Sequence, residues 1–247
     1  MNEKKENPRS IIEFTSYMTR FELVCALLWL PVHLFGLPRL IGPFLERGNL
    51  DEAQANLLVY AIGALFLLAV EFRFLRRDFD PLCDNFFRSL FHVLLCYAIM
   101  MALNMCIGGL ISVFEYLTSG NAAVQNQNNE AIIEMTESAS GPMSALALYL
   151  APFVEEIIFR GAMFSSIRNR SRTWAYIVSM LAFSVYHVWS FAIYDPLYWI
   201  YIIQYLPASF ALCRCYEKTN SIWGSYLLHM LVNFVSLQAL NALEGLL

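Results

Sequence analysis

Two adjacent glutamates and an arginine interrupt an apolar run in the stretch APFVEEIIFRG, residues 151–161. Arg160 follows Glu156 by four residues, which is the favourable order and spacing for an ion pair on one helix. Glu155 lies about 100° around the helix from Glu156 and has no such local partner. An unpaired carboxylate in an apolar setting is a candidate general base. A purely structural role is the alternative, in which the ion pair joins helices and Glu155 is protonated.

Two later segments place histidines in apolar runs. His187 in AFSVYHVWSF follows Phe183 by one turn, and in SYLLHMLVNF Asn233 follows His229 by one turn. We count residues from the end of each segment that would face the inner side of a membrane. Glu155 and both histidines then come about 8–13 residues in, which is a similar depth at about 1.5 Å of rise per residue. These groups could hydrolyse an amide: Glu155 takes a proton from water, a histidine orients that water, and His with Asn stabilises the oxyanion.

The elements that must position these residues are long apolar segments. Hydrophobic residues make up 58% of the 247-residue chain and charged residues 15%, against about 25% charged in soluble domains. A bilayer crossing needs about 20 apolar residues. The composition therefore predicts an all-α, polytopic membrane helix bundle with about seven transmembrane helices, an active site within the membrane, and a single domain over residues 1–247. The candidate spans are 23–45, 57–75, 88–114, 142–164, 174–194, 197–213 and 222–240.

The distribution of Lys and Arg predicts the orientation of these spans. Basic residues gather at alternate connections, and the positive-inside rule then puts the N-terminus in the cytoplasm and the C-terminus outside. The longest outer segment, 118–141, is either an amphipathic helix or a solvated loop. The net charge of −4 argues against a nucleic-acid partner, so the expected partners are the lipid bilayer and a protein or peptide substrate. Apart from Arg160 inside the fourth span, the basic residues are Lys4, Lys5, Arg9 and Arg20, then Arg73, Arg76, Arg77 and Arg88, then Arg168, Arg170 and Arg172, then Arg214 and Lys218, with only Arg39 and Arg47 in the first connection.

The remaining candidate ligands and thiols favour structural roles. A lone histidine in an apolar helix is usually a hydrogen-bonded packing residue, and this is the expectation for His33 and His92. The six cysteines stand mostly in apolar runs and are expected to be buried thiols rather than disulfides. A glutamate with two histidines is nevertheless a set that could ligate zinc.

Three short motifs in the C-terminal half occur in a characteristic order. They are EEIIFR (155–160), FSVYH (183–187) and HMLVN (229–233). In these motifs the chain resembles the CPBP family, the CAAX-prenyl endopeptidase and bacteriocin-processing (Abi) intramembrane proteases, whose motifs are E-E-x-x-x-R, F-x-x-x-H and H-x-x-x-N. The resemblance covers residues 141–240, and the three N-terminal spans add only hydropathy.

The resemblance implies an intramembrane endopeptidase of glutamate type. Glu155 would be the base, His187 would hold the attacking water, and His229 with Asn233 would form the oxyanion hole. The resemblance favours a site without metal or other cofactor. It implies cleavage of a membrane-associated protein or peptide, in a bacterial cell membrane or alternatively in the endoplasmic reticulum. The supporting residues would be the ion pair Glu156 and Arg160, and the packing residue Phe183.

Two other classes of function compete with proteolysis. A non-catalytic scaffold or bacteriocin-immunity protein of the same fold would have less reason to keep Glu155, His187, His229 and Asn233 together. A transporter would also place charged groups in the membrane, but it would more often show repeated halves. No internal repeat is visible in this sequence.

Overall fold

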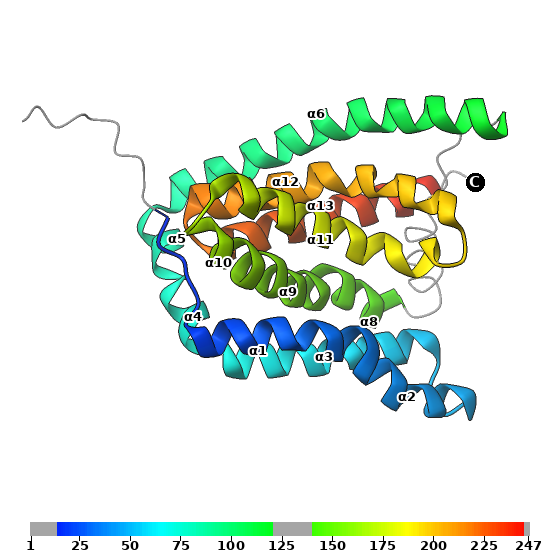
Figure 1. Ribbon diagram of the computed structural model, residues 1–247, viewed down its shortest axis with the longest axis horizontal. Coiled ribbons are helices and arrows are strands. Elements are labelled where there is room, and N and C mark those ends of the chain that lie inside the picture. Colours follow the sequence, from blue (N-terminus) through cyan, green and yellow to red (C-terminus); the bar gives the residue numbers. More distant parts are fainter. Residues whose placement is uncertain (1–13, 121–139, 245–247) are drawn as a thin grey trace, which may run out of the picture.

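Every regular element that the structure describes is a helix. The structure is a computed structural model, and it describes residues 14–120 and 140–244. No strand occurs in these two ranges. Figure 1 shows the long helices lying roughly side by side. In chain order the elements are α1 (Arg20–Pro31), η1 (Val32–Gly36), α2 (Leu37–Glu46), α3 (Glu52–Val70), α4 (Phe72–Arg77), α5 (Asp80–Asp84), α6 (Phe86–Ser119), α8 (Ser140–Ala145), η2 (Leu146–Leu150), α9 (Ala151–Glu156), η3 (Ile157–Phe164), α10 (Ser165–Arg168), α11 (Arg172–Ala192), η4 (Pro196–Tyr201), α12 (Ile202–Thr219) and α13 (Ile222–Glu244).

Local sequence signals set where several of these helices begin. Thr19 and Glu22 form a reciprocal capping box at α1, and Asp51 with Gln54 does the same at α3. The Ser171 hydroxyl accepts a hydrogen bond from the Trp174 backbone N–H at the start of α11. Such caps satisfy backbone N–H groups that have no partner inside the helix.

Five helical stretches are long and apolar enough to cross a membrane. They agree with the first five predicted spans, and the protein is a multi-pass, all-α membrane protein. The sixth and seventh predicted spans coincide with η4–α12 and with α13, which are helical but are not among the five. In α12, Arg214, Glu217 and Lys218 raise the polarity of an 18-residue helix. Seven spans are therefore compatible with the structure. The five are Arg20–Glu46, Glu52–Val70, Phe86–Thr118, Gly141–Arg168 and Arg172–Ala192.

The outward faces of the helices carry many large apolar side chains. Phe87 is 83% exposed, Leu117 76% and Phe21 70%. Water would make such a surface unfavourable, whereas lipid chains solvate it. This exposure agrees with the predicted lipid bilayer partner.

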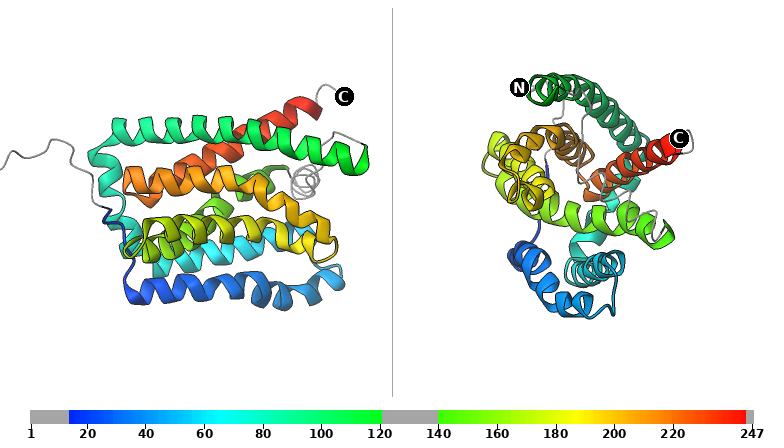
Figure 2. Two further views of the ribbon diagram at one scale, coloured as in Figure 1. Left: turned by 45° about the horizontal axis from the view of Figure 1, so that its top comes forward. Right: turned by 90° about the vertical axis from the view of Figure 1, so that its right-hand side faces the viewer.

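The segment from α8 to α10 lies at the centre of the bundle. It has 56% of its most apolar window buried, compared with 17% for Phe86–Thr118. Its α9 and η3 parts pack against α1, α3, α11, α12 and α13. Viewed along the helices, the green central segment lies between the blue and cyan N-terminal helices and the yellow to red C-terminal ones (Figure 2). Charged groups in this segment are therefore surrounded by protein rather than by lipid.

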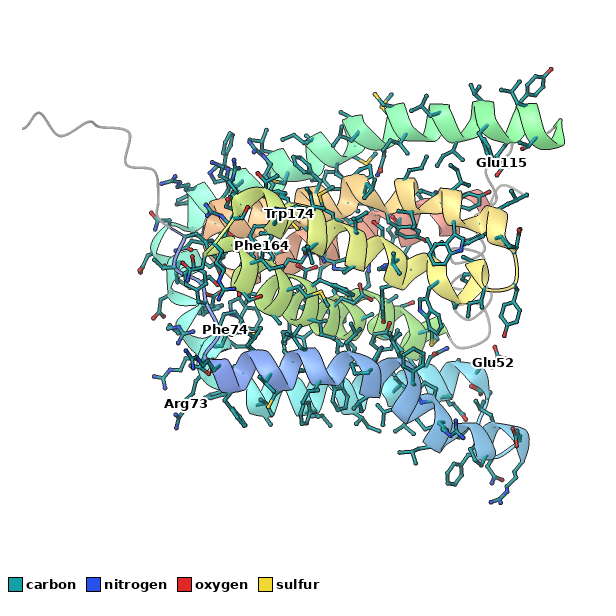
Figure 3. All side chains as sticks on the ribbon, in the orientation of Figure 1. Glu52, Arg73, Phe74, Glu115, Phe164 and Trp174 are labelled. Atoms are coloured by element: carbon teal, nitrogen blue, oxygen red, sulfur yellow. The ribbon has the colours of Figure 1, made fainter. Side chains whose placement is uncertain are left out.

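Charged side chains lie at both ends of the bundle. Arg73 lies at the end of the bundle where α1 begins, on the left in Figure 3, and Glu52 and Glu115 lie at the other end. At the end with Arg73, the Glu217 carboxylate accepts hydrogen bonds from Arg168 and Arg172 at distances of 2.7 to 3.1 Å. The sequence assigns this end to the cytoplasm.

Glu217 is held in its charged form by those contacts. Burial raises the pKa of the carboxyl group, but hydrogen bonds from Arg172, Arg168 and Tyr176 outweigh burial and lower it to about 2. The Tyr176 hydroxyl donates to the same carboxylate at 3.0 Å. The cluster joins α10, α11 and α12 at one end of the bundle.

A short non-helical segment, residues 14–19, precedes α1 and packs on the last helical hairpin. The Thr15 backbone N–H donates to Asn220 Oδ1 at 2.8 Å, and the Tyr216 hydroxyl donates to the Ser16 carbonyl at 3.0 Å. Phe14 meets Tyr216 edge to face, with ring centroids 5.1 Å apart. Asn220 adopts a left-handed conformation (φ 53°) in the turn between α12 and α13, which asparagine tolerates better than most residues.

Two further sequence expectations concern the thiols and the outer segment. All six cysteines are free, and Cys96, Cys213 and Cys215 are buried as expected, whereas Cys83 and Cys106 are exposed. The prediction for 118–141 falls mostly on residues outside the described ranges. Helix α6 reaches Ser119 and ends at Gly120, which has the left-handed conformation (φ 71°).

Candidate active site

Glu155 and Glu156 are the last residues of α9, immediately before the π-helical segment η3. Their side chains are buried, with exposed fractions of 5% and 1%. Short π-helical segments interrupt the regular i to i+4 pattern and are frequent at functional sites. The two carboxylates leave the helix in different directions and have different partners.

The predicted ion pair between Glu156 and Arg160 is present inside the bundle. Arg160 Nη1 lies 2.9 Å from Glu156 Oε1, and the arginine is fully buried. Its Nη2 donates to the Ser209 hydroxyl at 3.0 Å. The guanidinium carbon lies 4.3 Å from the centre of the Phe183 ring, a cation–π contact. The pair therefore connects η3 with α11 and α12, as a structural ion pair would.

Glu156 also binds His229, a contact that the sequence analysis did not predict. His229 Nδ1 lies 2.9 Å from Glu156 Oε1. The Ser225 hydroxyl, one turn earlier on α13, donates to Glu156 Oε2. Since a carboxylate only accepts hydrogen bonds, Nδ1 of His229 carries the proton. Glu156 thus fixes the orientation of the imidazole ring.

His187 is fixed by its own helix and by two aromatic rings. Its Nδ1 lies 2.9 Å from the Phe183 carbonyl oxygen. A carbonyl can only accept, so Nδ1 donates and Nε2 of a neutral ring is an acceptor. The imidazole lies between Phe183, with centroids 4.3 Å apart, and Tyr205, which stacks on it at 4.7 Å.

Glu155, His187 and His229 converge as the sequence predicts. Glu155 Oε2 lies 3.7 Å from His187 Nε2 and 3.8 Å from His229 Nε2. Within the described residues, this oxygen has no hydrogen-bond partner. The separations are too long for direct hydrogen bonds, but a single water could bridge groups at this spacing. Glu155 Oε2 thus faces both Nε2 atoms at distances that one bridging water could span.

Asn233 lies one turn beyond His229 on α13, but its observed contact is elsewhere. Its Nδ2 donates to the Ala147 carbonyl of η2 at 2.8 Å. The side chain is half-buried. In this structure Asn233 joins α13 to η2, and one of its two amide N–H groups remains for another acceptor.

The motif-bearing part of the chain matches a known family. Residues 138–235 match the family model of type II CAAX prenyl endopeptidase Rce1-like proteins. Over this segment the chain is similar to the Rce1-like family. The segment contains every residue of the predicted site, and it covers less than half of the chain. The match supports a CAAX-type intramembrane protease fold and confirms the resemblance seen in the three motifs.

A curated protein also resembles the Rce1-like segment. It is the UPF0177 protein YxdF of Lactococcus lactis subsp. lactis (strain IL1403), which is 30% identical over 95 residues. The alignment covers 38% of this chain and 48% of that protein, so the chain spans about half the length of the relative that it matches. No solved structure matches the chain.

Several polar residues around the Rce1-like site were missed by sequence reasoning. Ser225 precedes His229 by four residues and so lies on the same helix face, a signal that could have identified it. Ser209 comes from the predicted sixth span and carries no local signal. Tyr186 directly precedes His187, and Tyr60 comes from α3, outside the family match. Only the three-dimensional packing places Tyr60 beside Glu155.

The structure also bears on the zinc alternative. In the parts of the chain that the structure describes, no group of three or more His, Cys, Asp or Glu side chains has the arrangement of a metal site. The Nδ1 atoms of both histidines are already bound to the protein. Nε2 of each ring faces Glu155, and chelation experiments can test whether a metal is required there.

Proposed function

We propose that this protein is an intramembrane endopeptidase, in which Glu155 activates water to hydrolyse a peptide bond. The observation that carries the proposal is the unpaired Oε2 of Glu155, 3.7 and 3.8 Å from the Nε2 atoms of His187 and His229. The match to the Rce1-like family model, a family of proteases, supports the same reaction. A scaffold would have less reason to keep an unpaired carboxylate oxygen facing two imidazoles.

The first step is attack by water on the scissile carbonyl carbon. A water between Glu155 and His187 donates one hydrogen to Glu155 Oε2 and the other to His187 Nε2, which is an acceptor in the neutral ring. Its lone pairs then face the substrate. As the oxygen–carbon bond forms, Glu155 takes the proton and the carbonyl electrons move to its oxygen.

The oxyanion that forms needs hydrogen-bond donors. His229 donates its Nδ1 proton to the Glu156 carboxylate, and in the proposed step its Nε2 faces the oxyanion and carries the second N–H of the ring. Asn233 donates one amide N–H to the Ala147 carbonyl and retains the other. These two groups form the proposed oxyanion hole.

Collapse of the intermediate restores the carbonyl and breaks the carbon–nitrogen bond. Glu155 returns its proton to the leaving nitrogen, so the carboxylate is regenerated. The products are a carboxylic acid and an amine, which together contain all the atoms of the substrate and the water. Burial of the site inside the bundle limits access of other water molecules.

The substrate class is a membrane-associated protein or peptide, and the name of the family model makes a prenylated CAAX protein one case to test. A bacterial cell membrane is the proposed location, because the relative with a curated description is bacterial. A single domain over residues 1–247 remains part of the proposal.

The test compares membranes from cells that produce the wild-type chain with those that produce Glu155→Gln. Labelling of new protein termini should find at least one cleavage product that disappears with Glu155→Gln. Glu71→Gln is a matched control, since it removes another buried carboxylate at the end of α3 and should leave that product intact. An identical set of termini in wild type and Glu155→Gln would overturn the proposal.

A further inference from the structure

Three hydrogen-bonding side chains connect the N-terminal helices to Glu155. Tyr60 Oη on α3 lies 2.7 Å from Tyr186 Oη on α11, which lies 3.1 Å from His33 Nε2 on η1. The Tyr60 hydroxyl also lies within interacting reach of the Glu155 carboxyl group, because α3 packs on α9. We propose that Tyr60 is a positioning residue for Glu155, and that Tyr186 and His33 orient its hydroxyl. The inference rests on the proposed function, in which Glu155 is the base.

The direction of this hydrogen-bond chain follows from the state of His33 Nδ1. His33 is buried, with an exposed fraction of 4%, and its Nδ1 has no hydrogen-bond partner among the described residues. An unpaired buried N–H is rarer than an unpaired acceptor. The proton of His33 therefore lies on Nε2, which donates to Tyr186.

The other hydrogens then point toward the carboxylate. With its oxygen occupied by His33, the Tyr186 hydroxyl donates to Tyr60, and the Tyr60 hydroxyl donates to Glu155. Each donor polarises the next in such a chain, which strengthens the last hydrogen bond. A carboxylate accepts this bond well because it carries the charge. The chain is thus matched to the ionised form of Glu155, the form that a base requires.

The rings in the chain are also held by packing. The His33 ring meets the Tyr60 ring edge to face, with centroids 4.7 Å apart. Tyr186 packs against Phe159 at 5.4 Å and against His187 at 5.3 Å. The hydroxyl groups consequently have little freedom to turn away, and the carboxyl group of Glu155 is restrained while Oε2 faces the two histidines.

This arrangement gives the N-terminal part of the chain a direct role in the site. Tyr60 and His33 lie outside residues 138–235, the segment that matches the family model. The π-helical η1, which follows Pro31, places His33 toward the centre of the bundle. Helices α1 to α3 therefore do more than anchor the protein in the membrane.

Infrared difference spectroscopy tests the contact without any substrate. The carboxyl band of Glu155 is the band that Glu155→Gln removes from the spectrum of the purified protein. Tyr60→Phe should shift this band, and Tyr186→Phe and His33→Leu should shift it by smaller amounts. Tyr216→Phe, which removes another buried hydroxyl that is bound to Ser16, should leave it in place. An unshifted band in folded Tyr60→Phe would overturn the proposal.

Kinetics tests the positioning role on the cleavage product that Glu155→Gln abolishes. Tyr60→Phe should lower kcat by about ten- to a hundredfold with KM unchanged, because a misplaced catalytic group costs about that much. Tyr186→Phe should lower kcat little further in the Tyr60→Phe background, since the hydrogen-bond chain to Glu155 is already interrupted there. His33→Gln keeps an N–H donor and should recover part of what His33→Leu loses.

The outcomes separate this inference from the proposed protease activity. If Glu155→Gln abolishes cleavage but Tyr60→Phe keeps full kcat, the positioning role is wrong and the protease assignment stands. If Glu155→Gln still cleaves, the protease assignment is wrong, and the infrared shift alone decides whether Tyr60 holds Glu155. A variant of Tyr60 that fails to fold is replaced by 3-fluorotyrosine at position 60, which keeps the ring and alters the hydroxyl.

Discussion

His229 Nδ1 lies 2.9 Å from Glu156 Oε1, the same oxygen that accepts a hydrogen bond from Arg160 at 2.9 Å. One carboxylate thus neutralises the buried arginine and fixes the ring that faces Glu155. The two adjacent glutamates have different tasks, because Glu156 is fully engaged and Glu155 Oε2 is not. This relationship changes what the loss of Glu156 should do.

Glu156→Gln should reduce both stability and cleavage. It leaves Arg160 in the interior without a counter-charge, and breaking a buried ion pair typically costs about 3–5 kcal/mol. It also removes the carboxylate charge that His229 Nδ1 faces, so cleavage should fall even in the protein that folds. Melting temperature in detergent and cleavage rate per folded molecule measure the two effects. Full activity per folded molecule would mean that Glu156 has no part in holding His229.

Glu155→Gln should abolish cleavage and leave stability nearly unchanged. The amide keeps the shape of the carboxyl group but cannot take a proton, so cleavage should be lost. Its melting temperature should stay near that of the wild type, since no ion pair is broken. Melting curves recorded beside cleavage assays for Glu155→Gln, Glu156→Gln and Arg160→Ala compare the roles directly. An active Glu155→Gln enzyme beside a folded, inactive Glu156→Gln enzyme would exchange the assignments.

Removing Glu217 should lower stability at neutral pH and remove one source of acid sensitivity. The folded pKa of about 2 lies below the ordinary value of 4.5. The carboxylate therefore contributes stability that is complete above pH 4.5 and is lost as the pH falls toward 2. Melting temperatures of wild type and Glu217→Gln should differ near pH 7 and approach each other near about pH 3. A gap that widens on acidification would contradict this sign.

Cleavage should not require a metal ion. The acid–base and oxyanion groups needed for hydrolysis are all side chains of the protein, so purified enzyme should stay active in a strong chelator. Metal analysis of the same sample should find no stoichiometric zinc. Loss of activity in chelator with recovery on added zinc would reassign Glu155, His187 and His229 as ligands.

The two chain ends should lie on opposite sides of the membrane. Reporter fusions at Lys5 and after Leu247 check this, with the Lys5 reporter in the cytoplasm. The grouping of Arg168, Arg172 and Glu217 at one end of the bundle agrees with that orientation. Reporters on the same side would mean an even number of spans, and then α12 or α13 would be the first helix to re-examine.

The sequence predicted the helical spans and the meeting of Glu155, His187 and His229, because hydropathy and helix rise determine depth in a membrane. It did not predict the direction of the Asn233 amide, which depends on how η2 approaches α13. The spacing argument also assumed regular α-helix, whereas Arg160 stands in a π-helical segment. Tyr60 could not be identified because no local pattern relates α3 to Glu155. The contact exists only because α3 packs on α9.

The packing of residues 14–19 on the last helical hairpin has a consequence for biosynthesis. Phe14, Thr15 and Ser16 leave the ribosome early. Their partners, Tyr216 for Phe14 and Ser16 and Asn220 for Thr15, are made only when most of the chain has been translated. The first helices enter the bilayer well before this contact can form. Assembly of the bundle therefore finishes after translation of α12, and ribosomes stalled before Tyr216 should carry chains whose N-terminal segment is still open to protease.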